Sequence, residues 1–364
     1  MTVRDICTCL EEFAPLAFQE SWDNSGLAVG WPQQEVRKVL ITLDINEAVV
    51  KEAMACGAQM IVGHHPVTLS GVRRLTGADE AERTLMAAVA GQIAIYVAHT
   101  NMDTAEGGVS HRMAQKLGLS NIRVLACRGN TLQKLVAYIP KAFLSEVREA
   151  LFAAGAGHVG NYDCCGFETE GNGMFRALPG TNPFAGKPGE RHTEAEIRFE
   201  TVFPSHLQSG VIAALLKTHP YEEVAYDIYG LRNSHQQTGL GVTGWLPAPV
   251  DEQAFLRLLK EVFHTPVLRH TCLRGKNIRK VALCGGSGSS LLPDALSSRA
   301  DIYVTADFKY HQFADAGKDI LVADIGHFES EQFTKEIFYD ILTKKNPTFA
   351  VQFSQVNTNP ISYL

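Results

Sequence analysis

The sequence has 364 residues, of which 45% are hydrophobic and 20% are charged, and its formal net charge is -6. The length predicts two or three compact units with sizeable cores, and the composition excludes a disordered or collagen-like chain. The acidic balance, with no local basic patch, argues against nucleic-acid binding. We find neither an apolar run of membrane-spanning length nor a secretory signal, so we expect no membrane association.

The first third of the chain alternates short apolar segments with helix-like segments. This strand-helix-strand rhythm predicts a parallel sheet with helices on its faces. The expected elements are a strand at 37–44, a helix at 46–58, a strand at 59–63 that runs into His64 and His65, a helix at 80–92, a strand at 94–100 that leads to Asp103, and a helical stretch at 111–117.

The middle of the chain, residues 131–233, has a different character and is expected to form an inserted module. Its order of strand, helix, strand-rich stretch, helix and strand is that of a ferredoxin-like α+β domain. Within it, residues 171–192 are rich in turn-forming residues, and we expect a long ordered loop there.

The last third returns to the first pattern. Apolar segments at 280–288, 301–311 and 320–331 each run into polar, Gly-containing turns. Residues 1–130 and 234–364 are therefore expected to form one discontinuous α/β domain around the insert.

The eight cysteines form no Cys-x-x-Cys pair, so we expect reduced, mostly buried thiols in a cytoplasmic protein. Cys7 with Cys9, and the adjacent Cys164 and Cys165, have the chemistry of metal ligands. No second pair accompanies either of them, and they are left out of the candidate site.

Histidines and carboxylates gather just after the expected strands. The carboxyl ends of parallel strands meet at one edge of a sheet, which favours a common site for these side chains. Adjacent residues on an extended backbone point apart, so His64 and His65 suit two neighbouring ions better than one. His327 and Glu331 are four apart at an expected helix start and share one face, where a carboxylate can bridge.

Together with Asp103 these four residues predict a site for two divalent ions. Three imidazoles and two carboxylates leave coordination positions open for water or substrate, as in catalytic sites. A single histidine is more often a structural residue than a metal ligand. We therefore interpret His99, His111 and His311 as structural residues and do not count them as ligands. The Gly-rich turn after Cys284 is equally consistent with an anion-binding loop and with a plain tight turn.

Long phrases of the sequence resemble the NGG-interacting-factor-three-like family, whose bacterial members are called GTP cyclohydrolase I type 2 homologues. They are SWDNSGL (residues 21–27), VGHHP (62–66), AHTNMDTAEGGV (98–109), TADFKYH (305–311) and DIGHFESE (324–331). The phrases GAGHVGNYDCCGF, TNPFAGKPG and HPYEEVAYDIY are similar to the middle module of the longer members, which is akin to trimeric nitrogen-regulatory and cation-tolerance proteins.

The resemblance implies a two-lobed dimetal domain with central sheets flanked by helices. It also implies a toroidal homohexamer built as a dimer of trimers, with the sites facing an internal cavity. It makes His64, His65, Asp103, His327 and Glu331 the ligands, with Glu331 bridging.

Two classes of function remain open, and both include a small-molecule substrate or ligand. The first is a metal-dependent hydrolase acting on a nucleotide, phosphoester or amide, in which His99 or Lys309 assists proton or charge handling. A triphosphate substrate would need several cations, for which Arg73, Arg74, Lys276 and Lys309 are the candidates. The second is a metal-containing regulatory or adaptor hexamer without turnover, and metal storage is a third alternative. The donor set favours zinc and also suits iron or manganese.

Overall fold

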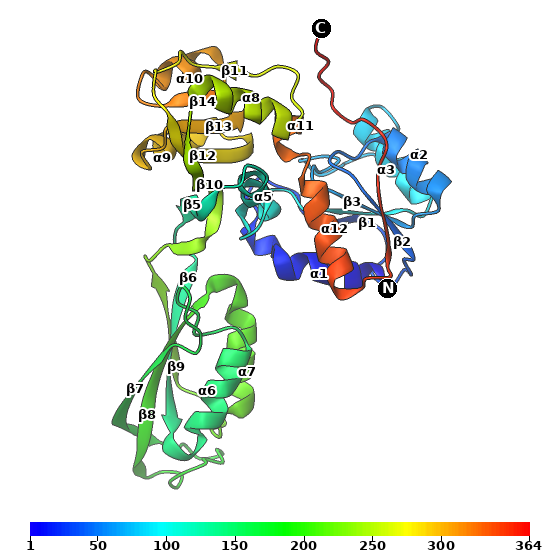
Figure 1. The fold of residues 1–364 in the computed structure, drawn as a ribbon. Coiled ribbons are helices and arrows are strands. Elements are labelled where there is room, and N and C mark those ends of the chain that lie inside the picture. Colours follow the sequence, from blue (N-terminus) through cyan, green and yellow to red (C-terminus); the bar gives the residue numbers. More distant parts are fainter. The chain divides into compact units, whose positions relative to one another are not determined.

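The chain folds into mixed α/β units in which several sheets are flanked by helices (Figure 1). The computed structural model describes all 364 residues. They divide into two compact units, unit 1 (residues 1–126 and 237–364) and unit 2 (residues 127–236). None of the helices combines the length and the apolar character that crossing a bilayer would need.

The first lobe of unit 1 is a sheet between two layers of helices. Its elements are α1 (Val3–Phe13), β1 (Gly26–Val29), β2 (Lys38–Ile41), α2 (Glu47–Cys56), β3 (Met60–Gly63), α3 (Glu80–Ala90), β4 (Ala94–Val97), α4 (Thr100–Thr104), α12 (Thr334–Lys345) and β15 (Ala350–Phe353). The strand order is β1-β4-β3-β2-β15, with all neighbours parallel except β1 and β4. Side chains alternate along each strand. In β2, Val39 and Ile41 pack against α1 and α12, whereas Leu40 packs against α2 and α3.

The second lobe repeats this plan. Its elements are α5 (Val109–Lys116), β5 (Ser120–Arg128), β10 (His235–Val250), α8 (Glu252–Val262), β11 (Arg269–His270), β12 (Ile278–Ser287), α9 (Leu292–Ser297), β13 (Ile302–Ala306), α10 (Tyr310–Asp315), β14 (Leu321–Asp324) and α11 (His327–Glu331). The order is β11-β14-β13-β12-β10-β5, and β12, β13 and β14 run parallel. Val281 and Leu283 face α5 and α8, whereas Ala282 faces α9.

Unit 2 is a four-stranded antiparallel sheet with two helices on one face. Its elements are β6 (Leu132–Pro140), α6 (Leu144–Ala153), β7 (Gly166–Arg176), β8 (Arg191–Pro204), α7 (Gln208–Thr218) and β9 (Tyr226–Leu231). The strand order is β7-β8-β6-β9, and Figure 1 shows α6 and α7, in green, lying together on the sheet. Alternate residues of β6 and β8, among them Ala137 and Phe199, form the core with these helices.

One expectation about unit 2 is wrong. Residues 171–192 are not one long loop, because 171–176 complete β7 and 191–192 begin β8, in an antiparallel pairing that extends to Arg176 opposite Arg191. The glycines at 171 and 173 suggest a turn in sequence, yet they lie in a paired strand. The connection between the strands is therefore only residues 177–190.

The parallel strands of unit 1 place their carboxyl ends at two sheet edges. In the first lobe, β2, β3 and β4 lead to Asp44, to His64 with His65, and to His99. In the second lobe, β13 and β14 lead to Asp307 and His327. The functional side chains of the next section come from these two edges.

The turn between α4 and α5 requires glycine at position 108. A Cβ atom there would lie 1.9 Å from the Met102 carbonyl oxygen and 2.9 Å from that of Ala105, and backbone atoms cannot move aside as a flexible side chain can. Forced overpacking typically costs about 1–3 kcal/mol. We therefore expect Gly108→Ala to lower the free energy of unfolding by at least that amount in urea denaturation.

The matched control is Gly71→Ala, because a Cβ atom at Gly71 would meet nothing within 4 Å. It should leave the urea midpoint unchanged. Equal midpoints for both variants would contradict the packing argument.

Candidate metal centre

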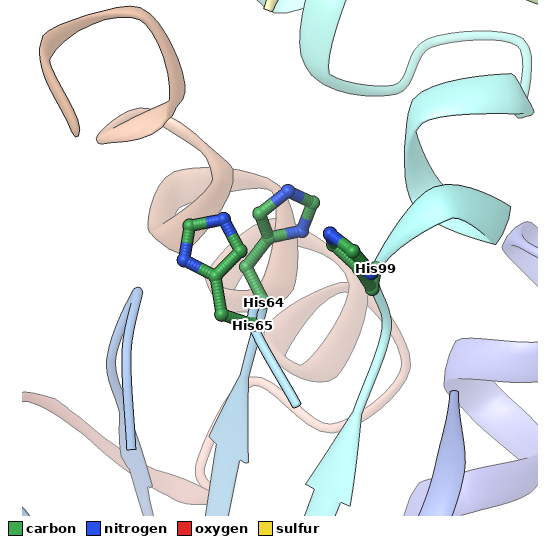
Figure 2. Close-up of side chains that lie close together, drawn as sticks. All are labelled: His64, His65 and His99. Carbon is green, nitrogen blue, oxygen red and sulfur yellow. The ribbon is translucent and has the colours of Figure 1, made fainter. Parts of the chain in front are cut away.

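The histidines and carboxylates expected at the sheet edges lie together in unit 1. His64 and His65 directly follow β3, and His99 is the residue before α4, which carries Asp103. Figure 2 shows the rings of His64, His65 and His99 gathered beyond the ends of their strands. His327 and Glu331 are the first and last residues of α11.

The Glu331 carboxylate lies at the centre of this cluster. Its Oε2 is 2.9 Å from Nε2 of His65 and 3.1 Å from Nε2 of His327, and its Oε1 is 3.7 Å from Nε2 of His64. Nε2 of His64 is also 3.8 Å from Oδ1 of Asp103. Three sets have donor atoms within 4.8 Å of one another and could each hold a metal ion: His65, His327 and Glu331; His64, Asp103 and Glu331; and His64, His65 and His99.

The three histidines of the first two sets are oriented by hydrogen bonds at Nδ1. His64 Nδ1 lies 2.8 Å from the Ala98 carbonyl oxygen, and the Nδ1 atoms of His65 and His327 lie 2.6 Å from carboxylate oxygens of Asp44 and Asp307. Donation to these oxygens places the proton on Nδ1 and leaves the Nε2 lone pair directed into the cluster. This arrangement is typical of metal-binding histidines.

Several donor atoms of the cluster have no protein partner. Nε2 of His64, Oδ1 of Asp103 and Oε2 of Glu331 are buried without a hydrogen bond, although Oε2 is within ion-pair distance of two imidazoles. Nε2 of His65 and Nε2 of His327 approach to 3.3 Å, and two lone pairs so close require a proton or a cation between them. Buried polar atoms are normally satisfied, so the residues fit a bound divalent cation.

Without a cation, protons provide the compensating charge. Burial alone would lower the pKa of His65, but its hydrogen bond with Asp44 and the nearby charge of Glu331 raise it to about 10. In the same way, Asp307 and Glu331 overcome burial and raise the pKa of His327 to about 11. Burial, and then the charge of Glu331, raise the pKa of Asp103 to about 7. The histidines outweigh burial at Glu331 and hold the pKa of its carboxyl well below the usual range.

The Gly-rich turn after Cys284 packs against Glu331. A Cβ atom at Gly286 would lie 2.1 Å from Glu331 Oε1, so only glycine leaves room for the carboxylate. The N–H groups of Gly285 and Gly286 donate to the hydroxyls of Ser110 and Ser330. Because these donors are used internally, the structure favours a tight turn over an anion-binding loop.

His99 has its own carboxylate partner. Its Nδ1 lies 2.7 Å from Oδ1 of Asp23, and the other oxygen of Asp23 accepts from the N–H and hydroxyl of Thr100 and from the hydroxyl of Ser25. Burial opposes the shift, but these hydrogen bonds hold the pKa of the Asp23 carboxyl well below its usual range. The His99 side chain is held firmly while 15% of it stays exposed.

Lys309 is not brought into the cluster. It is exposed, its backbone N–H donates to the side chain of Gln312, and its ammonium forms no ion pair with a cluster residue. His311 is also exposed, and His111 lies half-buried on α5. All eight cysteines are free thiols and none belongs to the cluster, but only Cys7 and Cys284 are buried, so the expectation of mostly buried thiols is wrong.

Three carboxylates that orient the histidines, Asp23, Asp44 and Asp307, were not among the site residues predicted from the sequence. Asp44 and Asp307 each follow a strand of the same two sheets, which was the available signal. Asp307 also has a positive φ of 60°, a strained conformation that Asp tolerates better than most residues. Nothing in the sequence indicated that the Thr358 hydroxyl would donate to Asp44 from the C-terminal segment.

The fold and this cluster define an α/β protein with a candidate metal site between two sheet edges. The Duf34/NIF3 (NGG1p interacting factor 3) family model matches residues 1–360, and the chain belongs to that family.

Similar proteins cover the whole chain. Proteins named GTP cyclohydrolase 1 type 2 homolog from Halalkalibacterium halodurans and Bacillus subtilis are 37% and 36% identical, over 97% and 99% of this chain and 96% and 98% of their own. A Bacillus cereus protein related to NIF3 has a crystal structure that matches with a TM-score of 0.87 at 34% identity, covering 100% of this chain and 99% of its own. A Staphylococcus aureus crystal structure matches at 26% identity with a TM-score of 0.79 and the same coverage.

The raised pKa values predict how pH acts on the metal-free protein. In the folded protein Asp103, His65 and His327 keep their protons to a higher pH than in the unfolded chain. The free energy of unfolding therefore falls as pH rises from the unfolded to the folded pKa of each group. This range is 3.8 to about 7 for Asp103 and 6.5 to about 10 to 11 for the histidines. A bound divalent ion needs the deprotonated ligands. We expect the increase in melting temperature on adding Zn²⁺ to grow from pH 6 to pH 9. An increase that shrinks over this range would contradict the assignment.

The aspartates that orient the histidines give a second prediction. Asp44→Asn and Asp307→Asn preserve shape but weaken the hold on the imidazoles, and loss of such a partner typically lowers metal affinity by about 10- to 100-fold. Competition with a chromophoric chelator measures this. The exposed Asp319→Asn is the control, and affinities equal to that of the control would show that the orientation is unimportant.

Proposed function

We propose that the cluster binds two divalent ions, one held by His64, Asp103 and Glu331 and the other by His65, His327 and Glu331. Oε1 of Glu331 faces His64, and its Oε2 faces His65 and His327. A carboxylate that bridges two ions would have this arrangement. The observation that carries the proposal is the set of three buried donor atoms that form no hydrogen bond, His64 Nε2, Asp103 Oδ1 and Glu331 Oε2.

We further propose that this site hydrolyses a small molecule. When bound, two ions with open positions would lower the pKa of a coordinated water and polarise the bond under attack. The protein's part is to fix the ligand atoms through Asp44 and Asp307 and to exclude bulk water around Glu331. His99, oriented by Asp23 and partly exposed, is the proposed proton-transfer residue. Lys309 stays a weaker candidate for charge handling, because it is exposed and forms no ion pair with a cluster residue.

The substrate class is a nucleotide, a phosphoester or an amide. The names of the relatives favour a guanine nucleotide. The charges of the site support a triphosphate less well, because three of the histidines are each hydrogen-bonded to a carboxylate, from Asp23, Asp44 or Asp307. Arg73 and Arg74 line a separate, largely apolar cavity beside Trp31. Phosphoester and amide bonds are therefore the first to be tested.

Zinc is the proposed metal because a donor set of imidazole and carboxylate suits it. Iron and manganese accept the same ligands, and affinity order does not decide which ion is loaded. Elemental analysis of protein purified without added metal distinguishes them.

The alternative function is a metal-containing regulatory hexamer without turnover. We propose that unit 2 is a ferredoxin-like domain, because its element order is β-α-β-β-α-β and its strand order is β7-β8-β6-β9. The resemblance of this module to trimeric nitrogen-regulatory proteins supports an added regulatory role. We propose that the protein assembles as a toroidal homohexamer of two trimers. Light scattering should then give six chain masses.

The decisive variant is Glu331→Gln, which preserves shape but weakens bridging. For a dinuclear hydrolase we expect two ions per chain in the wild type, loss of at least one in the variant, and a fall in metal-dependent turnover of at least about 100-fold, the scale of losing one strong electrostatic contribution in an active site. Elemental analysis and a panel of phosphoester and amide substrates provide the readouts.

Glu261→Gln is the control, because Glu261 is exposed on α8, away from the cluster. Two ions without turnover on the panel, together with a weakened hexamer in Glu331→Gln, would favour the regulatory function. More than two ions per chain would favour storage, and no bound metal would refute the central proposal.

A further inference from the structure

Unit 2 contains a cavity built entirely from its own residues. Its volume is about 670 Å³ and it lies between β7, β8, the connection 177–190 and the segment that follows α7. Cavities of this size suit small organic ligands. No residue of the metal cluster lines it, so any ligand there is bound independently of the ions.

A buried carboxylate lines this cavity. Glu196 on β8 is only 8% exposed, and no lysine or arginine lies within ion-pair distance of it. Its Oε1 accepts a hydrogen bond from the Tyr221 hydroxyl at 2.7 Å, and its Oε2 has no partner in the protein. A buried carboxylate with one neutral partner is poorly compensated. A cationic ligand would supply the missing charge.

The backbone of β7 leaves room for this carboxylate. A Cβ atom at Gly173 would lie 2.0 Å from Glu196 Oε2, so glycine at this position lets the carboxylate lie directly against the strand. The exposed side chain of Met174 follows it on the opposite face of the strand.

Aromatic rings form the remaining wall. The ring centroid of Tyr221 lies 5.8 Å from that of Phe184 and 6.2 Å from that of Phe175. Aromatic faces attract cations, and such groups of rings are used to bind organic ammonium ions. The rings also offer apolar surface to the body of a ligand.

The charges of the lining exclude a phosphate-bearing ligand. The lining has four glutamates, at 170, 196, 222 and 223, and two arginines, at 176 and 198. Arg198 is paired with Glu200 and Glu170 with Lys141, and both partners lie outside the lining, which leaves three glutamates against one arginine. Negative charge therefore exceeds positive charge, and an anion would be repelled.

Hydrogen bonds fix the groups that face the cavity. The Tyr221 N–H donates to Nδ1 of His219, whose Nε2 in turn donates to the Tyr138 carbonyl oxygen, so a neutral histidine sets the position of Tyr221. The Asn182 N–H donates to the Glu222 carboxylate, which ties the connection 177–190 to the opposite wall. The cavity is preorganised and does not depend on a loose loop.

From the buried carboxylate, the aromatic wall and the acidic balance, we propose that unit 2 binds a small organic cation with an apolar body. The ammonium or amidinium group pairs with Glu196 Oε2, and the body lies against Phe175, Phe184 and Tyr221. The site is separate from the metal centre and does not depend on the proposed hydrolysis.

The test uses the full-length protein and three probes with one phenyl ring each, benzylammonium, benzyl alcohol and benzoate. Calorimetry and ligand-observed NMR should show saturable binding of benzylammonium and at least tenfold weaker binding of benzoate. Glu196→Gln should weaken benzylammonium at least tenfold while changing benzyl alcohol little. Binding of benzylammonium should persist after metal removal, which excludes coordination to the ions.

Two further variants keep the test decisive. Glu168→Gln removes an acid of β7 that pairs with Arg148 outside the cavity and should leave binding unchanged. Phe184→Ala truncates a ring that is half exposed, so folding should tolerate it, and benzylammonium should bind several-fold more weakly.

Benzoate binding as tightly as benzylammonium, or full affinity in both Glu196→Gln and Phe184→Ala, would overturn the proposal. Failure of benzylammonium to bind would also overturn it. A change in the oligomer mass of Glu196→Gln in that case would show that a second copy of the chain occupies the cavity.

Discussion

A buried negative charge at Glu331 is the constraint on which unit 1 depends. The side chain is 4% exposed and lies at the meeting of two sheet edges, where imidazoles are its nearest charged partners. A buried carboxylate is stable only if positive charge accompanies it. In the metal-free protein the compensation comes from protons on His65 and His327, and the proposed divalent ions would compete with these protons for the same lone pairs.

This competition explains the outer layer of the site. Asp44 and Asp307 would be costly as isolated half-buried acids, but each holds an imidazole at 2.6 Å. They direct the Nε2 atoms inward, whether a proton or a metal occupies the space. The metal-free cluster is therefore protonated but already shaped by these hydrogen bonds.

Sequence patterns predicted much of this arrangement because parallel strands obey a strict geometric rule. Once the segments before His64 and His327 are assigned to strands, their carboxyl ends must meet at sheet edges, and the candidate residues follow. The pattern cannot say which acid orients which imidazole, because Asp44 and His65 meet only through the order of β2 and β3 in space. Lys309 follows the same strand as Asp307, but it is exposed and forms no ion pair with the cluster, so the strand rule alone does not assign it a role.

The same limits apply to unit 2. Its order of helices and strands was predicted from periodicity. The glycines at 171 and 173 favour a turn by local preference, but they lie in β7 because this segment pairs with β8. Gly173 has its place in that strand for a reason that only the structure reveals, namely contact with Glu196. A residue that weakens a strand can thus mark a position where another group approaches the backbone.

The candidate ligands lie far apart along the chain, and His327 follows His65 by 262 positions. During synthesis His64, His65 and Asp103 would emerge long before α11, and α12 and β15, which complete the first lobe, would emerge later still. At ordinary translation rates of about 5–20 residues per second the interval is roughly 10–50 seconds. Loading of the proposed ions would therefore be a late step in the protein's biogenesis, because it needs His327 and Glu331 in place.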